Sequence, residues 1–177
     1  MRRIKALMVV ALLVCMVLPN QSVALAAERG LTVRESESEI RELSENEVNA
    51  LLSEKQEPGE IAWDSSQVSR DTSHSVYQYT KAYEFYDDDV RVARVEIECI
   101  VWHYTDGKVH LYSRSITASR IDNYNIVKTY GQIVNTDGSL SYTSGDSVYI
   151  SSFVASWDYA LEFRITPSGH TFSCYEI

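Results

Sequence analysis

Large apolar and polar side chains alternate between Ser75 and Ile177, a pattern typical of β-strands with one buried face. In the longest such stretch, Val90 to Tyr104, the apolar residues at odd positions from Ala93 to Val101 share one face. Turn residues interrupt the alternation every 10 to 15 residues. We therefore predict a mainly β domain, an antiparallel β-sandwich or barrel of about 7–8 strands. The predicted strands cover residues 77–85, 90–104, 110–118, 124–134, 140–143, 148–157, 159–166 and 170–175.

The strongest hairpin signal is Thr105–Lys108, because its central Asp-Gly pair tolerates the positive φ angles of a two-residue type I′ loop. Such a loop places His103 opposite His110 and Cys99 opposite Arg114. Two imidazoles about 5 Å apart are able to share a metal ion, so His103 and His110 are weak candidates for metal ligands. No third ligand stands at a suitable spacing, and hairpin tips commonly carry solvated polar side chains.

Residues 27–71 form an acidic segment with 12 acidic and 5 basic residues, in which Trp63 is the only aromatic residue. Ser44 and Glu47 have the spacing of a capping box, which predicts the start of one short helix ahead of the β domain. A short apolar stripe follows, and Pro58-Gly59 is expected to end the helix.

The residues just upstream, Glu37–Leu43, are expected to add a further helical turn. A stripe this short buries little surface, so the helix must dock on something to persist. One interpretation of residues 27–71 is an acidic spacer. The other is a pro-segment or intramolecular cover that packs on the β domain.

Met1–Ala26 has the features of a secretory signal peptide. Basic residues precede an apolar run from Ala6 to Leu18, and Ala24-Leu25-Ala26 supplies the small residues that signal peptidase needs. As a helix, the run rises roughly 20 Å, short of a hydrocarbon core of about 30 Å, which disfavours a membrane anchor. We expect a signal peptide at 1–26, the acidic segment at 27–71 and a β domain at 72–177. The product is predicted to be a secreted bacterial protein with no membrane span after signal cleavage.

The net charge narrows the class of partner. The chain carries a formal net charge of −9, and removal of Arg2, Arg3 and Lys5 with the signal leaves −12. A nucleic-acid binder needs a basic face, so this class is excluded. No sequence motif predicts a cofactor.

Cleavage of the signal would also remove Cys15 and leave Cys99 and Cys174. An even pair of cysteines in an exported protein predicts a disulfide between Cys99 and Cys174. The alternative is two buried free thiols that act as small hydrophobic side chains.

Two short motifs resemble catalytic or metal-binding sites only weakly. Gly145-Asp146-Ser147 repeats three letters around the nucleophile of chymotrypsin-like proteases, but Val148 and Tyr149 replace the two glycines that should follow. Asp87-Asp88-Asp89 could contribute to a calcium site, yet it lacks the spacing of an EF-hand loop. We interpret the first as a loop and the second as a solvated turn.

Aromatic side chains are the most suggestive feature, since all twelve tyrosines lie between Tyr77 and Tyr175. An aromatic sheet face on an exported domain is able to stack on sugar rings or to anchor a protein. The alternative is that both faces of the first hairpin are simply buried. The candidate binding residues are Trp102, Tyr104, Tyr112 and Trp157.

The favoured hypothesis is a non-enzymatic binding module of the cell exterior with a glycan or protein partner. A second hypothesis is a small secreted hydrolase or toxin-like effector whose acidic segment is a removable pro-segment. It expects a concave site with at least two of His103, His110, His170, Glu96 and Glu98. A third is a structural or inhibitor-like domain that offers an exposed edge strand to a partner sheet.

Overall fold

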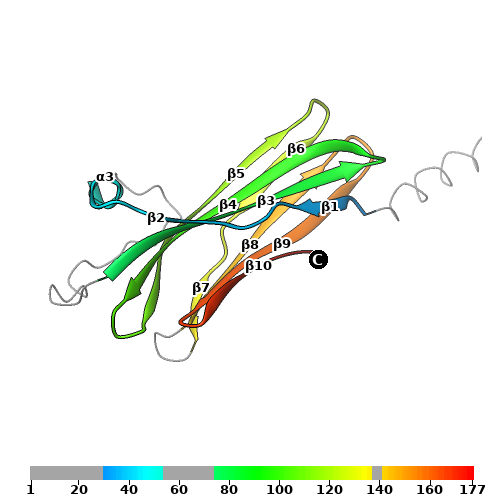
Figure 1. Cartoon of the computed structure of the whole chain (residues 1–177). Coiled ribbons are helices and arrows are strands. Elements are labelled where there is room, and N and C mark those ends of the chain that lie inside the picture. The colour runs from blue at the N-terminus through cyan, green and yellow to red at the C-terminus, as the bar shows by residue number, and fades with distance from the viewer. Residues whose placement is uncertain (1–29, 54–73, 137–140) are drawn as a thin grey trace, which may run out of the picture.

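A computed structural model describes residues 30–53, 74–136 and 141–177, and shows two antiparallel sheets that face each other (Figure 1). The first sheet has the order β1-β3-β4-β5, with β2 also paired to β3, and the second has the order β10-β9-β8-β6, with β7 also paired to β8. The first sheet comprises β1 (Thr32–Glu35), β2 (Glu39–Glu42), β3 (His74–Asp87), β4 (Val90–Tyr104) and β5 (Val109–Arg120). The second comprises β6 (Asn125–Thr129), β7 (Ile133–Thr136), β8 (Ser141–Ser151), β9 (Ser156–Thr166) and β10 (Gly169–Glu176).

The prediction of a mainly β, sandwich-like fold is confirmed, but its count of 7–8 strands is too low, because ten strands are present in the described ranges. The one described helix, α3 (Glu45–Ser53), follows β1 and β2 instead of preceding all the strands. The expected helical turn at residues 37–43 is also wrong, since residues 39–42 form β2. These short edge strands are mostly exposed, so they have no apolar period by which they could be recognised.

The start of α3 is as the capping box predicts. The Glu47 carboxylate accepts hydrogen bonds from the Ser44 amide at 2.8 Å and from the Ser44 hydroxyl at 2.7 Å, and it also pairs with Arg41. Leu43, Val48 and Leu51 pack against an aromatic cluster on the first sheet. Residues 30–53 are therefore built into the sandwich through β1, β2 and α3. No helix in the described ranges is long and apolar enough to cross a bilayer.

The Asp87–Asp89 segment forms a turn, as predicted. Asp88 and Asp89 have φ angles of 44° and 66°, and Asp87 pairs with Val90, which is the geometry of a two-residue type I′ loop. The Tyr124 hydroxyl donates to Asp87 Oδ2 at 2.7 Å. This bond ties the turn to the loop between β5 and β6.

The hairpin between β4 and β5 has a different register from the predicted one. The Tyr104 amide donates to the Lys108 carbonyl at 2.9 Å, and Gly107 has a φ of 85°, so the loop contains three residues instead of two. His103 therefore lies opposite Val109, and His110 lies opposite Trp102. The predicted pairing of His103 with His110 is wrong.

A bulge then restores the predicted register further along the same hairpin. Val101 pairs with Leu111 and Ile100 pairs with Ser113, which leaves Tyr112 as an extra residue on β5. Beyond the bulge, Cys99 lies opposite Arg114, as predicted.

The predicted strand at 124–134 is divided into β6 and β7, and both pair with β8. Thr129 pairs with Ser147 and Ile133 pairs with Ser144, so the residues between them include one extra on the β6–β7 side. This bulge is centred on Gly131. The Asp137-Gly138 pair, which is a turn signal between two of the predicted strands, lies outside the described residues.

The main core lies between the two sheets. Its largest fully buried side chains include Tyr83 and Phe85 from the first sheet and Tyr159 and Phe163 from the second. The edge of β5 is closed by side chains from the segment that follows it. Tyr130 Oη accepts from the Ile116 amide at 3.1 Å, and Lys128 Nζ donates to the Ile116 carbonyl at 2.8 Å. These bonds occupy backbone groups that an added strand would need.

The predicted disulfide is not formed, because Cys99 and Cys174 are both free thiols. Cys99 lies on β4, inside the first sheet, where it is buried opposite Tyr79 and Arg114. Cys174 lies on β10, the outer strand of the second sheet. Burial raises the pKa of both thiols, with Glu35 contributing at Cys174, whose pKa is raised to about 12. The even count of cysteines predicted a pairing that the strand order does not provide.

Candidate functional site

The four histidines of the chain lie at one end of the sandwich, because each is near the matching end of its strand. His74 begins β3, His103 and His110 flank the β4–β5 loop, and His170 begins β10. Tyr79 connects two of them, since its hydroxyl lies 2.9 Å from His103 Nε2 and its ring centroid lies 4.8 Å from that of His170. Strands from both sheets thus place imidazoles and phenols side by side.

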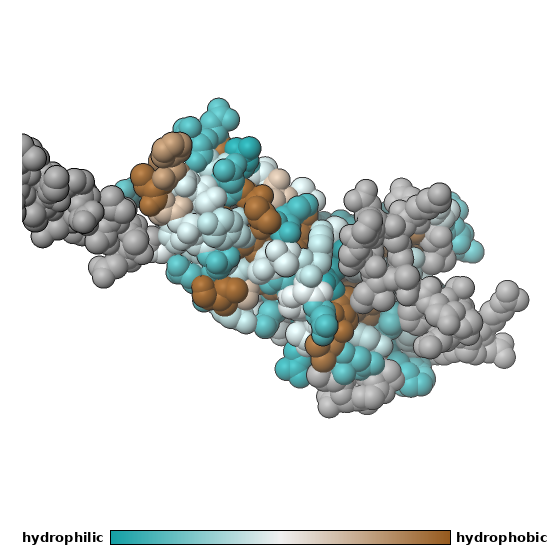
Figure 2. Space-filling view, turned by 180° about the vertical axis from the view of Figure 1, so that it is seen from behind, coloured by the Kyte–Doolittle hydropathy of each residue, from teal (hydrophilic) through white to brown (hydrophobic). Residues whose placement is uncertain are grey.

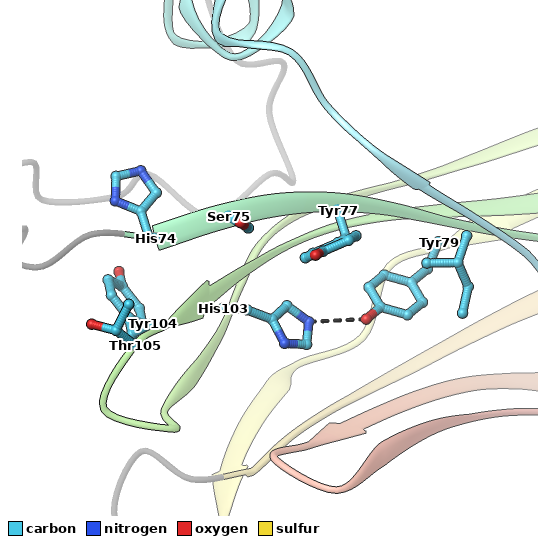
Figure 3. A pocket seen from close by; sticks show the side chains of 8 residues that line it. His74, Ser75, Tyr77, Tyr79, His103, Tyr104 and Thr105 are labelled. Atoms are coloured by element: carbon cyan, nitrogen blue, oxygen red, sulfur yellow. Dashed lines mark hydrogen bonds between the residues drawn. The ribbon is translucent and has the colours of Figure 1, made fainter.

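A pocket of about 480 Å³ opens at this end (Figure 3). Its lining combines aromatic rings, imidazoles and hydroxyl groups with one aliphatic side chain from β2. The described lining residues are Ile40, His74, Ser75, Tyr77, Tyr79, His103, Tyr104 and Thr105. Figure 3 shows the His103 ring beside Tyr77 and joined to the hydroxyl of Tyr79, with His74, Tyr104 and Thr105 on the other side of His103.

The centre of the pocket wall is the His103 imidazole. Its ring lies edge-on to Tyr77, with centroids 5.1 Å apart, and its Nε2 is within hydrogen-bond distance of the Tyr79 hydroxyl. Burial lowers the pKa of His103 and raises that of Tyr79. At neutral pH both groups are therefore uncharged, and the wall offers neutral donors and acceptors beside aromatic faces.

The structure brings together three of the four predicted binding residues. The Trp102 ring stacks on Tyr112 at 5.7 Å and lies 6.4 Å from Tyr104. Trp102 and Tyr112 are buried in a cluster that also contains Val76 and Ile100. The apolar side chains of α3 and of the preceding Leu43 pack against this cluster. Only Tyr104 of the three lines the pocket.

Trp157, the fourth predicted binding residue, lies elsewhere. It is on β9 in the core between the sheets, and its ring stacks against Tyr124 at a centroid distance of 6.4 Å. The four aromatic residues that the sequence suggested as one binding face therefore lie in three places. Trp102 and Tyr112 are covered by α3, Trp157 is in the core, and Tyr104 lines the pocket.

The metal candidates His103 and His110 face different tyrosines. His110 Nδ1 lies 3.0 Å from Tyr142 Oη, whereas His103 contacts Tyr79. Within the described ranges, no group of three or more histidine, cysteine or acidic side chains is arranged to hold a metal ion.

The residues suggested for a hydrolase are spread over the molecule. Of the set His103, His110, His170, Glu96 and Glu98, only His103 is among the described lining residues, although His170 contacts Tyr79. Glu96 pairs with Arg94 at 2.7 Å on β4. In the protease-like triplet, Asp146 is buried in an ion pair with Arg114, and Ser147 lies within β8 as a strand residue.

Sequence reasoning missed the residues from β2 and β3. Tyr77 and Tyr79 stand in the alternating pattern that predicted β3, but that pattern does not distinguish a core tyrosine from one at a pocket. His74, which begins β3, is not among the candidate residues that the sequence suggested. Its ring stacks on Trp102 at 4.5 Å with an interplanar angle of 2°. The clustering of aromatic and histidine residues near the strand ends was the available signal.

Burial of His110 predicts acid sensitivity. Desolvation lowers the pKa of His110 from 6.5 to about 4, so the folded state keeps the ring neutral while the unfolded chain takes up a proton. The stability that the neutral His110 ring contributes is complete above pH 6.5 and is lost progressively as the pH falls towards 4. We expect His110→Gln to reduce the difference in free energy of unfolding between pH 7.5 and pH 5, as measured by urea denaturation. His74→Gln, at the exposed histidine, is the control, and an unchanged pH dependence in His110→Gln would contradict the assignment.

No family model, curated protein or solved structure with which the chain was compared matches it.

Proposed function

We propose that the chain is an exported, non-enzymatic binding module of the cell exterior that recognises a neutral saccharide in the pocket between β2, β3 and the β4–β5 loop. The observation that carries the proposal is the lining of this pocket. Tyr77 and Tyr104 supply aromatic faces, and Ser75, Thr105 and His103 supply hydrogen-bonding groups. Sugar rings combine apolar C–H faces with hydroxyl edges, so they match such a mixture.

The charge of the site supports a neutral ligand. Burial holds the His103 ring in its uncharged form at neutral pH, and the described lining residues include no carboxylate, lysine or arginine. A protein ligand would have to enter with a narrow apolar or aromatic side chain, and this is the alternative partner for the same pocket. The predicted signal peptide supports a location outside the cell, where polysaccharides are abundant ligands.

A variant at Tyr104 tests the proposal. Isothermal titration of the full secreted chain against cello-, chito-, malto- and xylohexaose is expected to find at least one ligand. Loss of a stacking face in Tyr104→Ala should weaken its affinity by about tenfold. Tyr149→Ala removes a tyrosine that is 39% exposed on β8 and should leave the affinity unchanged. Equal thermal melting of both variants establishes that each is folded. Absence of binding to all four sugars, or equal loss in both variants, would contradict the proposal.

A further inference from the structure

Exposed apolar side chains gather at the end of the sandwich opposite the pocket. Phe153 is fully exposed at 102% and Val154 is 72% exposed, and both lie in the loop between β8 and β9. Val90 follows the β3–β4 turn with 56% exposure, and Ile121 begins the β5–β6 loop with 42%. Figure 2 shows apolar side chains protruding at this end. Exposed apolar groups on several loops are costly in water unless they meet a partner.

These three loops are joined to one another. The Tyr124 hydroxyl donates to Asp87, which connects the β5–β6 loop with the β3–β4 turn, and the Ile121 amide donates to the Val92 carbonyl at 3.1 Å. Asn125 pairs with Ser151, which brings the β8–β9 loop beside them. The apolar side chains therefore belong to one end of the molecule.

The β8–β9 loop presents its apolar residues in a fixed turn. The Ser152 amide donates to the Ala155 carbonyl at 2.8 Å, and the Ser152 hydroxyl accepts from the Ala155 amide at 3.2 Å. The Ser152 hydroxyl also accepts from the Val154 amide at 3.4 Å, so these bonds occupy three of the four amides of the loop while Phe153 and Val154 are exposed. A tip whose amides are mostly paired loses fewer hydrogen bonds to water when it enters an apolar phase.

We propose that this end of the sandwich inserts Phe153 and Val154 into the surface of a zwitterionic phospholipid membrane. Because Phe153 and Val154 protrude from the tip of a loop, they fit a surface that they can penetrate better than a flat protein surface. Acidic and basic side chains are mixed at this end, with Asp87, Asp88, Asp89 and Asp122 beside Arg34, Arg91 and Arg120. They form no basic patch of the sort that anionic lipids attract, so the apolar side chains supply the affinity.

The path of the chain supports this orientation. β1 begins at the same end, since Thr32 pairs with Tyr86 and the Leu31 carbonyl accepts from the Tyr159 hydroxyl at 3.2 Å. Eleven residues separate the predicted signal's apolar run from Gly30. They span at most about 40 Å, so until the signal is removed this end is held near the membrane. The pocket lies at the other end of β4, a 15-residue strand that spans roughly 50 Å.

Vesicle co-sedimentation of the full secreted chain tests the inference. The wild type should bind phosphatidylcholine vesicles, and Phe153→Ser/Val154→Ser should lower the partition constant by at least about tenfold. The control is Val134→Ser on β7, where the valine is 49% exposed and lies beside the start of β8, away from these loops, and it should bind as the wild type does.

Four outcomes would overturn the inference: no binding of the wild type, binding only to vesicles that contain phosphatidylglycerol, unchanged binding in the double variant, or equal loss in Val134→Ser. No binding of the wild type would leave a protein as the partner for this tip. Melting curves confirm that the variants fold. Because sugar binding is measured separately in the absence of lipid, failure of one proposal leaves the other intact.

Discussion

Asp146→Asn is expected to lower the free energy of unfolding by about 3–5 kcal/mol. Asp146 and Arg114 form an ion pair at 2.8 Å in which the side chains are 0% and 3% exposed. Asparagine preserves the shape but removes the negative charge, which leaves the buried guanidinium without compensation. Urea denaturation at pH 7 measures the loss, and a variant within about 1 kcal/mol of the wild type would contradict this role for the pair.

The double variant Arg114→Met/Asp146→Leu tests two contributions to the free energy of unfolding separately. One is the destabilisation caused by a single unpaired charge, and the other is the net contribution of the intact ion pair. Burial raises the pKa of Asp146 even though Arg114 opposes the shift, so desolvation of the carboxylate is not fully offset by its partner. Apolar side chains of similar volume avoid that desolvation. The double variant is therefore expected to be more stable than Asp146→Asn. If it is less stable, the pair and its hydrogen bonds to Gly131 together contribute stability that hydrophobic packing does not replace.

The sequence was most informative where a structural rule is local. Period-two alternation identified the core strands, because every second side chain of β4 from Ala93 to Val101 enters the core. The capping box at Ser44 and Glu47 placed the start of α3 for the same reason, since it depends on residues three apart. The turn at Asp88 and Asp89 also rests on local φ preferences.

Prediction failed where the length of a loop or the contact of distant strands decides the outcome. The His103–His110 pairing failed because a three-residue loop replaced the expected two-residue loop, and the Tyr112 bulge then restored the register. The contact between Tyr79 and His170 joins β3 to β10 and depends on how the two sheets stack. Cys99 and Cys174 form an even pair, but they lie on strands of different sheets and both thiols are free.

The bulge at Gly131 is another feature that no local pattern revealed. It explains the position of the Arg114–Asp146 ion pair, because both side chains bind the backbone of Gly131. The Gly131 amide donates to Asp146 Oδ1 at 3.0 Å, and Arg114 donates to the Gly131 carbonyl. One ion pair thus satisfies both backbone groups of the bulged residue. It also joins β5 of the first sheet to β8 of the second.

Gly131→Ala is expected to destabilise the protein by roughly 3 kcal/mol or more, because the bulge leaves no room for a side chain. A Cβ at this position would lie 1.5 Å from the Gly145 carbonyl oxygen, so the backbone of β8 or of the bulge must move and disturb the buried ion pair. Gly145→Ala is the matched control on the facing strand. Its Cβ would meet nothing within 4 Å, and stability should stay within about 0.5 kcal/mol of the wild type. Thermal and urea unfolding measure both variants, and similar stability of the two would show that the bulge relaxes at little cost and does not clamp the two sheets.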